Sequence, residues 1–191
     1  MQRNFTLITA LLSLPLCPVL AATESYTLDP NHSYVAWGVS HFGFSDQVGK
    51  WYVNGTIDFD AAKPQNSKVN VTIKVDEIVT GLSEFDKHLK GKLFFDTSKY
   101  PTATFVSDKI NVTGDKSAKI QGTLTVHGVS KSITLDVKLN KKDVNPLNNK
   151  PTLGFSATTN LKRSDYNIKT LLPSVGDDVQ LMIQVEANKG M

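Results

Sequence analysis

The sequence predicts an all-β domain of antiparallel strands with one short helix, and three observations lead to that prediction. From residue 33 onward, apolar and polar residues alternate with period two in one segment after another, which is typical of strands with one buried and one solvated face. Turn-forming pairs such as Lys63-Pro64, Gly114-Asp115 and Asn145-Pro146 separate these segments. No linker, repeat or low-complexity stretch divides the 191 residues, so we expect a single domain.

The first predicted strand follows residue 33, where Val35, Trp37, Val39 and His41 alternate with small or polar residues. The same alternation predicts further strands over residues 55–60, 69–76, 103–105, 110–112, 120–126, 133–139, 155–161 and 179–185. Short antiparallel strands at this spacing build either a sandwich of two sheets or a closed barrel. The alternation is compatible with both architectures.

One segment, residues 83–91, departs from the alternation and predicts a short helix. Leu82, Phe85 and Leu89 recur at helical spacing, Ser83 is placed to cap the first turn, and Gly91 follows the last turn.

The distribution of apolar residues bears on whether the interior is hollow or filled. Small or β-branched residues dominate the apolar faces, while bulky aromatic residues gather near the strand ends and the helix. These aromatic residues are Trp37, Phe42, Phe44, Phe85, Phe94, Phe95, Tyr100 and Phe155. This distribution suits a hollow barrel with aromatic walls. An ordinary filled core is the alternative, and the residues alone favour it.

The first residues, 1–22, have the pattern of a cleaved signal peptide. Arg3 is the only charge before Glu24, residues 5–16 are largely apolar, and Ala21 and Ala22 offer a small-residue cleavage site. The apolar stretch is short and interrupted by prolines, which argues against a membrane span. We therefore expect an exported protein whose mature domain covers residues 23–191.

The single cysteine, Cys17, falls within this predicted signal peptide. Lipidation of Cys17 is disfavoured because Leu14-Pro15-Leu16 precede it, where small residues are expected. The mature domain would then have no disulfide and must be stabilised by its own core.

Several function classes are disfavoured by composition and spacing. Lys and Arg number 21 against 18 Asp and Glu, without a dense basic block, so nucleic-acid binding is not expected. The four histidines, His32, His41, His88 and His127, are isolated, so we predict no metal site, although long-range convergence stays open. No G-x-S-x-G motif or glycine-rich phosphate loop occurs. The carboxylate pairs Asp58/Asp60 and Asp177/Asp178 are expected to be solvated. A binding protein without enzymatic activity fits best.

A series of motifs in this chain then points to a family. The motifs are Leu28-Asp29-Pro30-Asn31-His32-Ser33, residues 39–45 and 48–51, Leu93-Phe94-Phe95-Asp96, residues 100–107 and 122–131, Leu161-Lys162-Arg163-Ser164-Asp165-Tyr166, and residues 175–179. In their order and spacing they resemble the YceI-like polyisoprenoid-binding family of exported bacterial proteins. The family often has Phe and Gly where this chain has Tyr166 and Asn167, and often Arg where Lys87 stands, so details of the pocket are expected to differ.

The resemblance implies an extended antiparallel eight-stranded lipocalin-like barrel with one short helix. It implies a periplasmic protein that holds a polyisoprenoid or another long-chain amphiphilic lipid in its pore, for transport, storage or sequestration, with no other cofactor. The alternative function on the same barrel is a quinone- or haem-binding redox protein or enzyme. Edge strands and exposed aromatic residues also favour a homodimer.

On such a barrel we expect eleven side chains to line the lipid site. They are Trp37, His41, Phe59, Phe85, Leu89, Phe94, Phe105, Leu124, Phe155, Tyr166 and Ile168. His41 shares the parity of Trp37, so it should point inward near a strand end and either contact a lipid head group or bond to buried backbone. The helix is a candidate lid, because Phe85 and Leu89 share one face.

Overall fold

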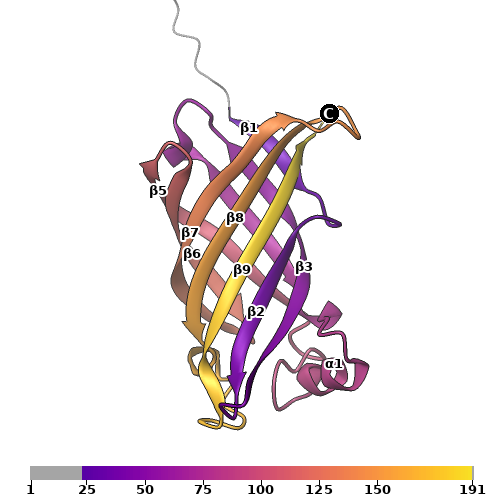
Figure 1. Ribbon diagram of the computed structural model, residues 1–191. Helices are drawn as coiled ribbons and strands as arrows, with labels where there is room; N and C mark the ends of the chain where they lie inside the picture. Colours follow the sequence, from indigo (N-terminus) through magenta and orange to yellow (C-terminus); the bar gives the residue numbers. More distant parts are fainter. Residues whose placement is uncertain (1–22, 191) are drawn as a thin grey trace, which may run out of the picture.

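The structure is a computed structural model that describes residues 23–190, and nine strands dominate it (Figure 1). The strands are β1 (Glu24–Leu28), β2 (Tyr34–His41), β3 (Ser45–Phe59), β4 (Lys68–Lys74), β5 (Thr102–Gly114), β6 (Ser117–Val126), β7 (Val129–Val144), β8 (Pro151–Lys162) and β9 (Val175–Lys189). One α-helix, α1 (Ser83–Lys90), and three short 3₁₀ helices, η1 (Pro64–Asn66), η2 (Val75–Glu77) and η3 (Arg163–Tyr166), complete the described chain. The predicted signal peptide, residues 1–22, lies outside the described residues.

The strands close into an eight-stranded antiparallel barrel, which confirms the predicted fold class. Around the sheet the order is β3-β2-β9-β8-β7-β6-β5-β4, and the pairing of β3 with β4 closes it. β1 and β2 together make the eighth position, because both pair antiparallel with β3 and with β9. Closure leaves no long unpaired edge in the sheet.

The segment between β1 and β2 keeps the barrel closed where the strand is interrupted. The hydroxyl of Ser33, which is fully buried, donates to the carbonyl of Glu186 at 3.0 Å and accepts from the Glu186 amide at 3.1 Å. The backbone N–H of Asp29 donates to the same carbonyl at 2.8 Å. Where the strand is interrupted between β1 and β2, the Ser33 hydroxyl therefore takes the place of a neighbouring strand's backbone and bonds to the backbone of Glu186 in β9.

Alternation along the strands places the apolar residues inside. On β2, Val35 and Trp37 are buried, and on β3 their neighbours Trp51 and Val53 are buried. The strands are longer than predicted: β3 has 15 residues and β7 has 16. The part of β3 that precedes its predicted start pairs with β2 in a hairpin, with Gly49 opposite Trp37 and Ser45 opposite His41.

The predicted helix is present and Gly91 follows its last turn as predicted, but the predicted cap by Ser83 is wrong. α1 begins at Ser83, Leu82 occupies the N-cap position, and no side-chain hydrogen bond caps this end. Instead the carboxylate of Asp86 accepts from the N–H of Thr80 at 2.7 Å and from its hydroxyl at 2.6 Å, which ties the helix to the segment before it. Figure 1 shows α1 beside the lower end of the barrel, outside β3.

The carboxylate of Asp60 lies in a different environment from the predicted one. Asp60 was expected to be solvated, but it is buried. It accepts from the backbone N–H groups of Ala62 and Lys63, at 3.0 and 2.8 Å, so the β3–β4 turn is built around its carboxylate.

Within residues 23–190, the helices are too short or too polar to cross a membrane.

Candidate ligand-binding site

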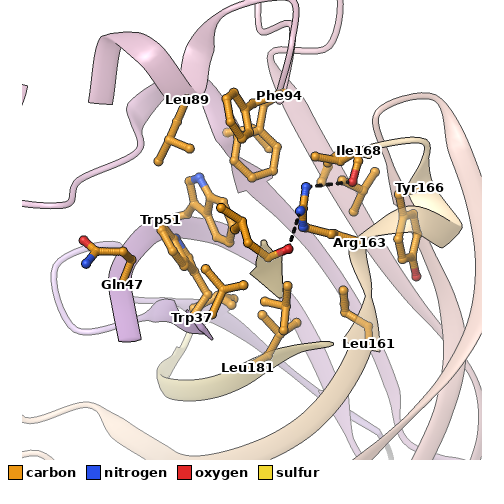
Figure 2. A pocket seen from close by; sticks show the side chains of 18 of the residues that line it. Trp37, Gln47, Trp51, Leu89, Phe94, Leu161, Arg163, Tyr166, Ile168 and Leu181 are labelled. Carbon is orange, nitrogen blue, oxygen red and sulfur yellow. Dashed lines mark hydrogen bonds between the residues drawn. The ribbon is translucent and has the colours of Figure 1, made fainter. Parts of the chain in front are cut away.

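Two cavities lie inside the barrel, one after the other along its axis. The first, of about 350 Å³, lies toward α1 (Figure 2). The second, of about 210 Å³, lies toward the opposite end, where Phe59 and Phe155 are. Four residues line both cavities: Val35, Ile73, Leu124 and Leu181. We call these four residues the waist. The walls on both sides of the waist are almost entirely apolar, so two apolar cavities lie end to end inside the barrel.

The structure places all eleven predicted site residues on these walls. Trp37, His41, Phe85, Leu89, Phe94, Tyr166 and Ile168 line the first cavity. Phe59, Phe105 and Phe155 line the second, and Leu124 belongs to the waist. Strand parity accounts for the strand residues, since every second residue faces inward. Contact of these side chains with a lipid stays a prediction.

Several wall residues were not among the predicted ones, and Trp51 and Arg163 matter most. Trp51 on β3 faces inward beside Trp37 on β2, and the centroids of the two rings are 5.8 Å apart. The sequence signal that could have indicated Trp51 is its alternation with Val53, two residues later on the same face. Arg163 begins η3 directly after β8. Arginines are mostly exposed, and nothing in the local sequence indicates that this one is buried.

Arg163 is buried and holds the β8–β9 loop through carbonyl groups. Its Nε donates to Gly176 at 2.8 Å, Nη1 to Ile168 at 3.1 Å and to Thr170 at 2.8 Å, and Nη2 to Val175 at 2.8 Å. In Figure 2 its side chain projects from the wall toward the side of the cavity where Trp37 and Trp51 lie. Burial lowers the pKa of the guanidinium, and the charge of Asp177 opposes that shift. Arginine remains protonated in proteins.

Three buried polar atoms, all in residues that line this cavity, have no hydrogen-bond partner among the described residues. They are the indole nitrogens of Trp37 and Trp51 and the hydroxyl of Tyr166. Burial raises the pKa of Tyr166 to about 12, and the charge of Asp165 adds to the shift, so its phenol stays protonated. All three groups can donate a hydrogen bond. Because these three atoms are covered by other protein atoms, the wall of the first cavity stays almost entirely apolar.

The loops at the α1 end place apolar side chains outside the mouth of the first cavity. His41, Gln47 and Leu171 line the cavity, while Phe42 and Phe44 in the β2–β3 turn point outward, and Phe44 is 92% exposed. The β2–β3 turn and the β8–β9 loop are joined, because the N–H of Phe42 donates to the carbonyl of Ser174 at 2.7 Å. Leu171 is half exposed, so apolar surface continues from the interior to the rim.

The four histidines occupy different places in the structure. His41 and His88 line the first cavity, and the ring of His127 lies 3.1 Å from the carbonyl of Tyr166. The fourth, His32, lies on the outside of the barrel and bonds to Asp29 at 2.9 Å. They do not meet at one place among the described residues.

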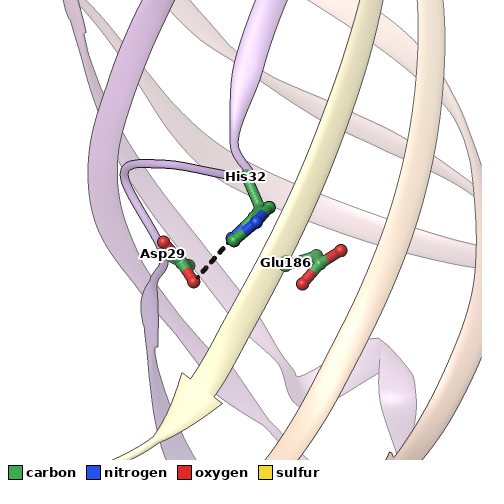
Figure 3. Close-up of side chains that lie close together, drawn as sticks. All are labelled: Asp29, His32 and Glu186. Atoms are coloured by element: carbon green, nitrogen blue, oxygen red, sulfur yellow. Dashed lines mark hydrogen bonds and ion pairs between the residues drawn. The ribbon is translucent and has the colours of Figure 1, made fainter. Parts of the chain in front are cut away.

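His32 does meet two carboxylates: ligand atoms of Asp29, His32 and Glu186 lie within 4.8 Å of one another (Figure 3). The hydrogen bond and the charge of Asp29 raise the pKa of His32. Burial raises the pKa of Asp29, but bonds from His32 and from the N–H of Asn31 outweigh it and leave that pKa lowered. These bonds join Asp29 to Asn31 and His32 at the break between β1 and β2.

Comparison with known proteins agrees with the barrel fold. Residues 26–187 match the family model of the YceI-like domain. Protein YceI of Escherichia coli O157:H7 is 38% identical over 169 residues, which covers 87% of each chain. The crystal structure of the Campylobacter jejuni YCEI protein superposes with a TM-score of 0.72 at 35% identity, covering 80% of this chain and 90% of that one.

A polyisoprenoid binding domain from Saccharophagus degradans has the same fold, with a TM-score of 0.69 at 17% identity over 87% of this chain and 99% of that one. The domain match extends from β1 to β9, and the identity to the E. coli protein covers most of both chains. This chain therefore belongs to the YceI-like family.

Proposed function

We propose that the protein is an exported lipid-binding protein of the periplasm, without enzymatic activity, that holds a polyisoprenoid or another long-chain amphiphile inside its barrel. The observation that carries this proposal is that two apolar cavities adjoin at the waist and together extend along the barrel. An elongated apolar space in a barrel suits one extended hydrocarbon tail. The Saccharophagus degradans domain is named for polyisoprenoid binding, but its likeness to this chain concerns the fold, so the case for a lipid rests on the cavities.

The energetics favour a lipid tail in this space. Burial of one CH₂ group contributes about 0.8 kcal/mol before the costs of binding. The net gain falls to about 0.3 kcal/mol per ligand atom for larger ligands, which still amounts to useful affinity for a long tail. Because apolar contact has no direction, the walls should select for tail length and shape more than for saturation.

We further propose that the ligand enters at the α1 end, where apolar surface continues from the first cavity to the exposed Phe42 and Phe44. Transport, storage or sequestration of the lipid would follow from binding and release there. α1 supplies Phe85, His88 and Leu89 to the wall at this end, which supports its role as a lid. A homodimer is also part of the proposal, and sedimentation of the mature protein tests it.

The experiment that tests the function is mass spectrometry on the mature protein purified from its native host. The intact folded protein is measured beside an organic extract of the same sample. We expect a stoichiometric long-chain lipid in the extract, with a matching mass increment on the folded protein. A ligand-free mass, with full recovery and no lipid in the extract, would contradict the proposal. An absorbance spectrum of the same sample distinguishes a quinone or haem, which absorb in the near-ultraviolet or visible, from an aliphatic lipid.

A further inference from the structure

Arg163 is the one residue with a permanent charge among those that line the first cavity. Neither Asp nor Glu occurs among these described lining residues. A buried charge in apolar surroundings is costly unless dipoles or an opposite charge compensate it. The need for apolar walls in a lipid cavity therefore does not explain why a cation lies in this wall.

The hydrogen bonds of Arg163 solvate its charge without neutralising it. All four go to neutral carbonyl groups, and none of the ion pairs found within residues 23–190 includes this arginine. The carboxylate of Asp177 lies near enough to affect the guanidinium, but it accepts from the N–H and hydroxyl of Ser164, at 2.9 and 2.8 Å. A guanidinium has five N–H donors, so Nη2 keeps one N–H without a partner among the described residues.

Three neighbouring polar groups are also buried without a partner among the described residues. They are the hydroxyl of Tyr166, three residues after Arg163, and the indole N–H groups of Trp37 and Trp51. The second cavity differs, because its charged lining residues, Asp115 and Lys116, lie in the exposed turn at its far end. Apart from that exposed turn, Arg163 at the α1 end is thus the one permanent charge among the described residues that line the two cavities.

We propose that the first cavity binds the anionic head group of the amphiphile at Arg163, and that the tail passes the waist into the second cavity. This inference rests on the proposed function and adds the class of ligand: an amphiphile with an acidic oxygen head group, carboxylate or phosphate, on a long tail. A carboxylate or phosphate accepts charge-assisted hydrogen bonds from a guanidinium. In an apolar cavity such a pair is weakly screened by solvent.

The test uses ligands that share one tail and differ in head-group charge: hexadecanoate, hexadecyl phosphate, hexadecan-1-ol and hexadecylamine. The chain has two tryptophans, Trp37 and Trp51, and both line the first cavity, so their emission reports binding directly. Ligand is titrated into the delipidated mature protein below the concentration at which micelles form. We expect the acids to bind about tenfold more tightly than the alcohol, and the amine to bind most weakly. The stronger of the two acids identifies the head group.

Two results overturn the inference in different ways. Equal affinities, or preference for the alcohol or amine, would contradict the anion site and leave lipid binding intact. No binding of any of the four ligands would contradict lipid binding, and the anion site with it.

A pair of adjacent variants tests the role of Arg163 itself. We expect Arg163→Met to lower the affinity for hexadecanoate about tenfold and to leave hexadecan-1-ol unchanged. Lys162→Met is the matched control, because Lys162 is exposed and paired with Asp178 at 2.9 Å. A folded Arg163→Met protein that still prefers the acid would overturn the inference. If the loss of the loop bonds unfolds this variant, the ligand series on the unmodified protein decides the question.

Discussion

The indole of Trp37 lies directly over Gly49, its cross-strand neighbour, so that a Cβ at residue 49 would come within 2.5 Å of Cζ2 of Trp37. Residue 49 faces inward, as Trp51 does, and the missing side chain makes room for the indole. The conformation of Trp37, and with it the shape of the first cavity, therefore depends on a glycine in the facing strand.

We expect Gly49→Ala to displace Trp37 and to lower the free energy of unfolding by about 1–3 kcal/mol, the usual range for overpacking. The displacement should also change the tryptophan emission. Gly38→Ala is the matched control, because a Cβ at residue 38 would meet its nearest neighbour, Val48, at an ordinary 3.9 Å. Denaturant unfolding with fluorescence detection measures both variants. Equal stability of the two would show that Trp37 adjusts without cost.

How far the sequence predicted this structure depends on the range of the interactions involved. Period-two alternation is local, so the strands and the helix at residues 83–90 could be identified from neighbouring residues. Barrel closure is not local: it requires β1 and β2 to pair with β9, about 150 residues later in the chain. The choice between sandwich and barrel therefore came from the family resemblance, and periodicity left it open.

The candidate site likewise contains residues that the local sequence predicts and a residue whose position depends on distant parts of the chain. Parity places Trp37 and Leu124 on the inner face, and they line the cavity as expected. The burial of Arg163 depends on carbonyl groups of Ile168, Thr170, Val175 and Gly176 that a loop brings together. No spacing in the sequence encodes that convergence, so an arginine next to a polar strand end is read as exposed.

Two buried tyrosines allow a matched prediction about unpaired hydroxyl groups. The hydroxyl of Tyr26 donates to the carboxylate of Glu24 at 2.9 Å, whereas that of Tyr166 has no partner within residues 23–190. Tyr26→Phe should lower the free energy of unfolding by about 1 kcal/mol, as for a lost hydrogen bond. Tyr166→Phe should leave it unchanged or raise it, because it removes a buried donor that lacks an acceptor. Thermal unfolding without ligand measures both, and a larger loss for Tyr166→Phe would contradict the assignment.

The pair Asp29–His32 predicts a small pH dependence of stability. Its hydrogen bond and charge raise the pKa of His32 above the ordinary value of 6.5. A raised pKa in the folded state means that protonated His32 favours folding below the ordinary pKa, and that this contribution disappears as the pH rises through the raised value. Nuclear magnetic resonance of the His32 ring protons between about pH 5 and pH 9 measures the shift.

Asp29→Asn is the control for this pair, because the amide oxygen can still accept from the N–H of Asn31. In this variant the pKa of His32 should return toward its ordinary value. A pKa at or below that value in the unmodified protein would show that the pair does not persist in solution.

The lid role of α1 predicts an effect on rates. Phe85 and Leu89 line the first cavity from the helix, so the double variant Phe85→Ala plus Leu89→Ala should speed both uptake and release of a bound lipid. Truncation of Leu89, which is buried, also costs about 2–5 kcal/mol of stability, so folding must be verified. Lys87→Ala, on the exposed side of α1, should leave the rates unchanged. Stopped-flow tryptophan fluorescence measures them, and unchanged rates in a folded double variant would exclude the lid.

The waist between the cavities predicts how affinity depends on tail length. Val35 is buried and lines both cavities, so Val35→Phe should narrow the passage and stop a long tail at the waist. Each CH₂ group kept out of the second cavity loses up to about 0.8 kcal/mol of gross burial. Affinity for hexadecanoate should therefore fall at least about tenfold, while decanoate, whose shorter tail fits the first cavity, should bind nearly as before.

Val106→Phe makes the same change on the outer face of β5, where Val106 is 45% exposed, and should alter neither affinity. Overpacking at Val35 costs about 1–3 kcal/mol, so both variants are first compared by thermal unfolding. Equal losses for the two acids would mean that the tail stays in the first cavity, and the elongated site would then have to be abandoned.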